Sequence, residues 1–168
     1  MFVFVGLGWG RLAGMGDVGG HVPHPWRELA GMPHIDVVWT DQLPVTVRAA
    51  TDGHSTIWMS DGLVQRERRS SLAHELEHIR RGHRGCQSPA VEDHVRAHAA
   101  RRLLPDITDV ADGLVWAQGV LDVAAEELWV DTATVRARID VRWLHPAERA
   151  YLRRRIGEAG QQVTIRHG

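Results

Sequence analysis

The chain has 168 residues, 43% of them hydrophobic, which is enough to bury one ordinary core and predicts one compact domain with room for a small helical appendage. Twenty Lys and Arg residues against twenty-one Asp and Glu residues give a formal charge of -1, which excludes a global field drawing the protein to nucleic acid or an anionic membrane. A single cysteine, Cys86, excludes an internal disulfide and a zinc site built from cysteines, and it favours the cytoplasm as the location.

Residues 1–25 form the first segment. They carry much of the glycine and end in HVPHP, a composition typical of a flexible lead-in. The apolar start MFVFVGLGWG has no basic flank before it and falls short of the roughly 18 residues that span a bilayer. We therefore expect neither a signal peptide nor a membrane anchor here, and no membrane partner.

Three short runs rich in β-branched or aromatic residues follow, namely DVVW at 36–39, VTVRA at 45–49 and STIWM at 55–59. Such runs are typical of strands, and the LP and DG dipeptides between them are turn signals. The pattern predicts a three-stranded antiparallel sheet.

Helices are expected from residue 63 onwards. Residues 63–81 lack Gly and Pro and place Leu72, Leu76 and Ile79 at helical spacing before Gly82, and a second helix is expected over 91–104, before Pro105. Further helical stretches lie around 109–120, 123–129 and 132–140, followed by HPAERAYLRRRI, whose proline suits a helix start. The expected fold class is therefore α+β, with the sheet packed on the first helix.

The first helix contains the motif HExxH, in which His74 and His78 lie one turn apart on the same face and can bind one metal ion. Glu75 projects beside such an ion, where it can take a proton from a water molecule and later give it to a leaving amine. The alternative is that two of the eleven histidines are ordinary polar groups on a helix surface. The second helix offers Glu92, Asp93, His94 and His98 as a third ligand, and spacing alone does not choose among them.

The sequence AHELEHIRRGH followed by VEDHVRAHAARRLLP resembles the ImmA/IrrE family of zinc metallopeptidases. Over residues 35–105 it is similar to versions encoded by actinobacterial phages and their relatives. The resemblance implies a zincin-like core over residues 26–106 that binds Zn2+, with Glu92 as the third ligand. If the register is shifted by two residues, His94 becomes the ligand instead. Arg96 departs from the family, which often carries Asp or Asn at this place.

The resemblance also implies the function, a zinc-dependent endopeptidase whose substrate is a repressor or another regulatory protein. In zincin-like folds an edge strand holds the extended substrate, and STIWM is either that strand or an ordinary core strand. His83 is expected either to stabilise an oxyanion or to cap the first helix, and capping needs no active-site geometry.

The C-terminal region, residues 107–168, contains AAEELWVDTATVRARI, which has the rhythm of a helix-turn-helix. Thr132, Thr134, Arg136 and Arg138 would then lie on the reading helix, although Trp129 stands where the turn prefers glycine. The other interpretation is a helical core of Trp129, Val130, Val135 and Ile139. The alternative function is thus a DNA-binding or repressor-associated regulatory protein with a structural or vestigial metal site, and no nucleic-acid-binding residue is assigned. Glu75 favours catalysis, because a structural site has no use for a base.

Overall fold

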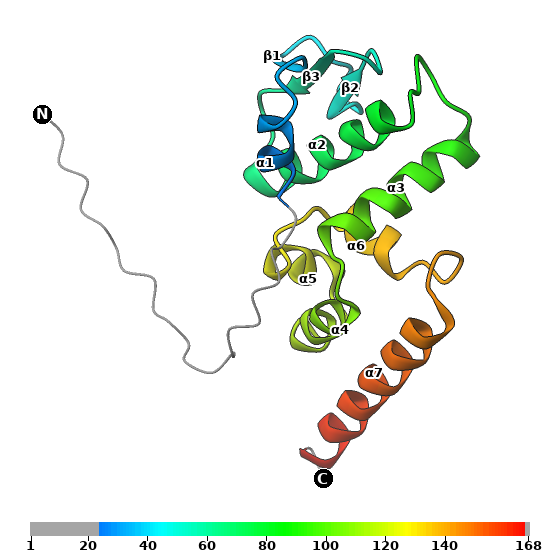
Figure 1. The fold of residues 1–168 in the computed structure, drawn as a ribbon. Helices are drawn as coiled ribbons and strands as arrows, with labels where there is room; N and C mark the ends of the chain where they lie inside the picture. The colour runs from blue at the N-terminus through cyan, green and yellow to red at the C-terminus, as the bar shows by residue number, and fades with distance from the viewer. Residues whose placement is uncertain (1–23, 167–168) are drawn as a thin grey trace, which may run out of the picture.

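A computed structural model of the protein describes residues 24–166 (Figure 1). The lead-in predicted for residues 1–25 lies outside the described residues, except for its last two. Pro25 belongs instead to a short helix, α1 (Pro25–Ala30), as its first residue. Proline suits this place because the first helical residue has no helical partner for a backbone N–H.

The described residues form an α+β structure with one three-stranded sheet and seven helices. The strands are β1 (Asp36–Thr40), β2 (Ala49–Thr51) and β3 (Thr56–Ser60). The helices after α1 are α2 (Gln65–Arg80), α3 (Pro89–Leu103), α4 (Ile107–Trp116), α5 (Leu121–Glu127), α6 (Thr132–Ile139) and α7 (Pro146–Arg166).

The sheet is mixed, because β3 lies in the middle and pairs in parallel with β1 and antiparallel with β2. The predicted sheet, antiparallel throughout, is therefore wrong for the β1 pairing. The cause is that the chain passes from one edge of the sheet to the other before β3 is inserted between them. Residues 41–48 make this crossing, with a turn in which the Val47 N–H donates to the Pro44 carbonyl at 2.7 Å. Only Ala49 of the predicted strand 45–49 lies in β2.

One face of the sheet packs on α2. Ile57 and Met59 of β3 are completely buried, as are Leu72 and Leu76 of α2, because alternate strand residues share a face and helix residues four apart do the same. Trp58, between the two buried strand residues, points to the other face and is 36% exposed. This packing fixes the orientation of α2, since its apolar face is held by the sheet.

A second core lies among the helices. Ala73 of α2 and Ala99 and Leu103 of α3 belong to it, so the C-terminal helices share a core with the two helices that carry the candidate ligands. Its other members include Val110, Leu114, Val130, Val135 and Leu152.

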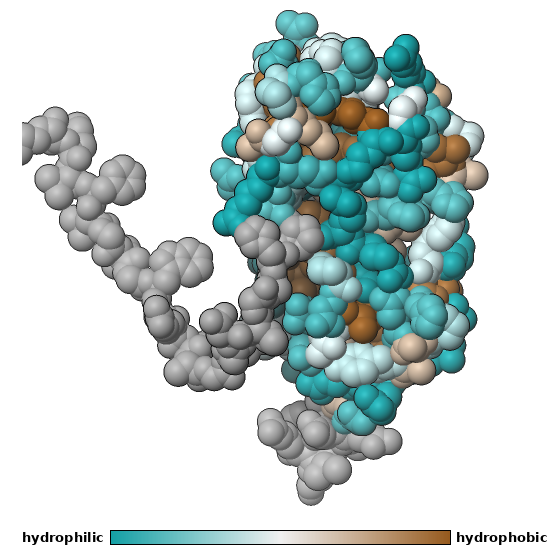
Figure 2. Space-filling model, viewed as in Figure 1, coloured by the Kyte–Doolittle hydropathy of each residue, from teal (hydrophilic) through white to brown (hydrophobic). Residues whose placement is uncertain are grey.

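Hydrophilic residues cover most of the face seen in Figure 2, and hydrophobic residues appear there in separate patches. The longest described helix, α7, carries Arg153, Arg154 and Arg155 near its middle. Within residues 24–166 no helix is both long and apolar enough to cross a membrane.

Candidate metal centre

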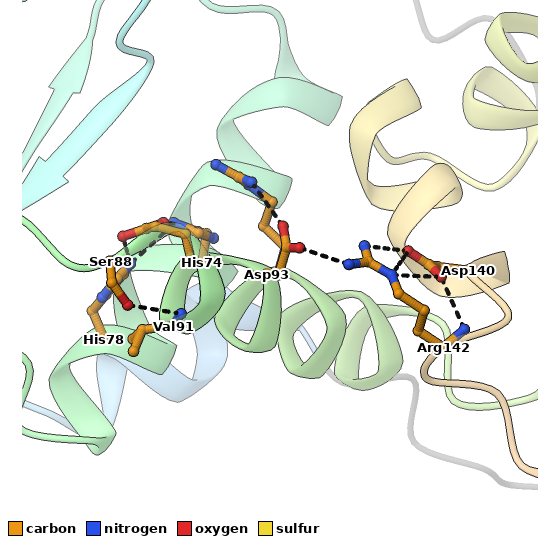
Figure 3. Close-up of polar contacts among 9 residues, drawn as sticks. His74, His78, Ser88, Val91, Asp93, Asp140 and Arg142 are labelled. Atoms are coloured by element: carbon orange, nitrogen blue, oxygen red, sulfur yellow. Dashed lines mark hydrogen bonds and ion pairs between the residues drawn. The ribbon is translucent and has the colours of Figure 1, made fainter.

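The face of α2 roughly opposite the one that packs on the sheet carries the two histidines of the HExxH motif. Because Leu72 and Leu76 contact the sheet, His74 and His78, each two residues further along, are turned away from it. Figure 3 shows both imidazoles lying close together beside the first turn of α3, near Ser88 and Val91.

A carboxylate from α3 completes the group. His74 Nε2 lies 3.1 Å from His78 Nε2 and 3.3 Å from Glu92 Oε2, and His78 Nε2 lies 3.5 Å from Glu92 Oε1. Ligands at zinc-bond lengths of about 2.0–2.1 Å in tetrahedral geometry stand about 3.3 Å from one another. The three side chains therefore fit a zinc ion with three protein ligands and one open position.

The start of α3 determines which residue reaches the histidines. Ser88 caps the helix by accepting a hydrogen bond from the Val91 N–H at 3.4 Å, which places Glu92 in the first turn. Asp93 accepts from Arg142 at 2.9 Å (Figure 3), and the His94 ring stacks obliquely on Trp143 with ring centroids 4.3 Å apart.

Among the described residues, the group that can hold a metal consists of His74, His78 and Glu92. The alternative ligand His94 lies outside it, and His98 is an exposed residue further along α3.

Burial keeps the two histidines in the form that binds metal. Desolvation, followed by the charge of His78, lowers the pKa of His74, and desolvation also lowers the pKa of His78. Both imidazoles are therefore neutral near pH 7, with ring nitrogens free to act as ligands.

Glu75 is buried beside the metal-capable group, with 6% of its surface exposed. Desolvation and the nearby charge of Glu92 raise the pKa of Glu75 to about 8. A divalent cation at the three ligands would act in the opposite direction and favour the carboxylate. The pKa of Glu75 therefore depends on whether a cation is bound at the three side chains. Such a dependence suits a group that accepts and donates a proton.

The centre lies in the wall of a cleft of about 1020 Å³. Its lining includes residues 45–51, the α2 residues around His74 and Glu75, the loop over 83–87, and the facing sides of α3 and α6. β2 is an edge strand of the sheet and is part of this lining, whereas β3 is the central strand. Of the two interpretations of STIWM, the core strand is therefore correct, and the edge that faces the cleft is β2.

His83 lies just beyond α2 and contacts a candidate ligand. Its backbone N–H donates to the His78 carbonyl at 3.1 Å, which satisfies a carbonyl at the helix end. Its ring Nδ1 lies 3.2 Å from Nδ1 of His78, the nitrogen on the side of the ring away from His74 and Glu92. The ring of His83 is therefore engaged with the centre, beyond the helix capping expected from its position.

The turn between α5 and α6 forms despite Trp129. This residue has φ 53°, the left-handed conformation for which a glycine is preferred, and its carbonyl accepts from Arg69 at 2.8 Å. Trp129 is 48% exposed, whereas Val130 and Val135 are completely buried, so the helical core contains the valines and not the tryptophan.

The suggested reading helix α6 does not present its arginines together. Arg138 is 2% exposed and donates to the Leu104 carbonyl at 2.7 Å and to Glu148 at 2.7 Å. Arg136 is exposed, while Ala133 and Thr134 line the cleft. One side of α6 is therefore a wall of the candidate active site.

Three cleft residues have no signal in the sequence. Ser70 accepts a hydrogen bond from the Asp131 N–H at 2.9 Å, and Asp131 accepts from Arg48 at 2.5 Å. These residues are far apart in the chain and meet only through the packing of α2, α6 and the segment before β2, so no motif marks them.

Comparisons with protein-family models, with curated proteins and with solved structures find no match for this chain.

Proposed function

We propose that the protein is a zinc-dependent endopeptidase with a zincin-like core, as the resemblance to the ImmA/IrrE family implies. The observation that carries the proposal is the convergence of His74, His78 and Glu92 from two helices, with the buried Glu75 beside them in the wall of a cleft. Two neutral histidines and one carboxylate are a common ligand set of catalytic zinc, and the base next to them distinguishes such a centre from a structural one.

In peptide hydrolysis, three residues of the chain would bind the metal and a fourth would transfer the proton. His74 and His78 from α2 and Glu92 from α3 hold the metal, which when bound supplies a Lewis acid that polarises the scissile carbonyl and lowers the pKa of water. The Glu75 carboxylate accepts a proton from the attacking water and passes it to the amine nitrogen as the peptide bond breaks.

The cleft suits an extended substrate. Among residues 24–166, β2 has a strand partner on one side only, so the backbone groups of its other side are available to a peptide that adds to the sheet edge. Such a peptide would run past His74 and Glu75, which line the same cleft. We propose a repressor or another regulatory protein as the substrate, on the basis of the family resemblance.

The test combines metal analysis with a cleavage assay. We expect one zinc per chain in the wild type, loss of zinc in His74→Ala and Glu92→Ala, and retention of zinc with loss of cleavage in Glu75→Gln. His94→Ala is the matched control on α3 and should keep both properties. The assay uses, as candidate substrate, any repressor whose gene lies next to the gene of this protein. Absence of stoichiometric metal from the wild type under any loading would overturn the proposal.

One observation favours the second candidate function, a DNA-binding or repressor-associated regulator. The left-handed Trp129 completes a turn between α5 and α6 of the kind that a helix-turn-helix needs. Arg138 is unsuitable as a probe because it is buried, so the informative variant is Arg136→Ala. A salt-dependent shift of duplex DNA that this variant weakens would support the regulator.

A further inference from the structure

His83 stands on the far side of His78 from the candidate metal. The Nε2 atom of His78 faces His74 and Glu92 at 3.1 and 3.5 Å, and its Nδ1 atom faces His83 Nδ1 at 3.2 Å. The two rings are inclined at 65° with centroids 5.3 Å apart, so the contact is made through the nitrogens at the ring edges. His78 is thereby held at both nitrogens.

The chemistry of imidazole decides the direction of this hydrogen bond. A neutral histidine that offers Nε2 to a metal must carry its proton on Nδ1. Nδ1 of His78 is then a donor, and Nδ1 of His83 is the acceptor, which leaves the proton of His83 on its own Nε2. Partners of this kind fix the tautomer and the ring orientation of metal-binding histidines in general.

The backbone around His83 is built for this contact. Gly82 has φ 64°, a left-handed residue that turns the chain back after α2, and the His83 N–H then bonds to the His78 carbonyl. Gly53, in the turn between β2 and β3, lies directly against the backbone of His83. A Cβ atom on Gly53 would lie 1.7 Å from the His83 carbonyl oxygen. The close approach of Gly53 limits how far His83 can move from His78.

We propose that His83 is a positioning residue, which accepts a hydrogen bond from Nδ1 of His78 and so prepares Nε2 of His78 for the metal. The inference rests on the proposed function, since it concerns the same centre, and it adds a residue that lies outside the three-ligand group. It makes the sequence from His74 to His83 a unit with two ligands, one base and one orienting residue.

The test measures metal binding directly. Zinc affinity, determined by competition with a chelator, is expected to fall about 10- to 100-fold in His83→Ala, the usual effect of removing such a partner. His83→Asn should restore most of the affinity, because its side-chain oxygen can stand near the position of the lost Nδ1 and accept the same hydrogen bond. His98→Ala, which removes an exposed histidine of α3, should bind zinc as the wild type does.

A spectroscopic measurement covers the case in which the alanine variant does not fold. The visible absorption of the cobalt-loaded protein reports the geometry of the ligands, and His83→Asn is expected to keep the wild-type spectrum. Unchanged zinc affinity in His83→Ala, or an equal loss in the alanine and asparagine variants, would overturn the inference while leaving the metal site intact. A changed cobalt spectrum in the asparagine variant would also overturn it. Failure of the wild type to bind zinc would remove the proposed function and this inference together.

Discussion

Arg138 of α6 and Glu148 of α7 form a partly buried ion pair, with Nη2 of the arginine 2.7 Å from Oε1 of the glutamate and the arginine only 2% exposed. Glu148 also accepts from Arg101 of α3 at 2.8 Å and from the His145 N–H at 2.9 Å. Three helices therefore meet at one carboxylate.

The first prediction concerns that carboxylate. Desolvation would raise the pKa of Glu148, but the hydrogen bonds from Arg101, His145 and Arg138 outweigh it and lower the pKa from 4.5 to about 2. Because the folded value lies below the unfolded one, the stabilisation is complete above about pH 4.5 and is lost as the pH falls towards 2. Glu148→Gln should therefore lower the free energy of unfolding at pH 7 by about 2 kcal/mol.

Urea unfolding at pH 7 and at acid pH measures this effect. Glu158→Gln is the control, because Glu158 is 55% exposed and its pairing with Arg154 is long, at 3.9 Å. The difference between the wild type and Glu148→Gln should shrink on acidification. A difference that stays constant with pH would show that the glutamine change acts through packing instead.

Zinc should stabilise the fold. The three candidate ligands lie on two helices and come together only in the folded chain, so free zinc at about 100 times its dissociation constant should add about 2.7 kcal/mol to the free energy of unfolding. The melting temperature should rise on zinc addition and fall back with a chelator. Glu92→Gln should lose the rise, and His94→Ala should keep it; the reverse pattern would make His94 the third ligand.

Gly53→Ala should destabilise the protein strongly. The added Cβ would overlap the His83 carbonyl, and the residue has φ 74°, so both a clash and backbone strain oppose the change. We expect a loss of about 3 kcal/mol, measured by thermal unfolding of the zinc-free protein. Gly62→Ala is the matched control, because no atom lies within 4 Å of its added Cβ. Equal stability of the two variants would mean that the loop after α2 moves freely.

Gln118→Gly should stabilise the protein. Gln118 is exposed, and its φ of 51° is a left-handed conformation that costs a residue with a side chain about 1 kcal/mol. The extra freedom of glycine in the unfolded chain offsets part of the gain, so the net effect is about 0.5 kcal/mol. Gln118→Ala removes the same side-chain atoms beyond Cβ without relieving the strain. A glycine variant no more stable than the alanine variant would contradict the prediction.

The helices that carry the candidate centre were predictable because their signals are local. The spacing of Leu72 and Leu76 identifies the face that α2 buries, and the spacing of His74 and His78 identifies the face that remains for a metal. Spacing alone left the third ligand open. The family resemblance favoured Glu92, and the capped start of α3 is what turns that residue towards α2.

The sheet was less predictable because its order depends on where the chain crosses. Nothing in the sequence of residues 45–49 shows that most of them belong to the connection between the two edge strands and not to a strand. The sequence STIWM is equally typical of an edge strand and of a central strand. Trp129 is a similar case, since the contacts that hold its carbonyl come from Arg69, sixty residues earlier. Such long-range determinants leave no pattern in a short window.

The open edge of β2 also bears on how the protein behaves at high concentration. Edge strands can pair with the edges of other copies and begin aggregation, and long, flat, apolar edges do so most readily. β2 has only three residues, it is preceded by the charged Arg48, and it borders a cleft lined by α3 and α6. To pair with β2, a second folded copy would have to bring the edge of its own sheet between these two helices. A single extended segment can pair with β2 without bringing a folded domain along. The architecture therefore limits self-association without closing the edge.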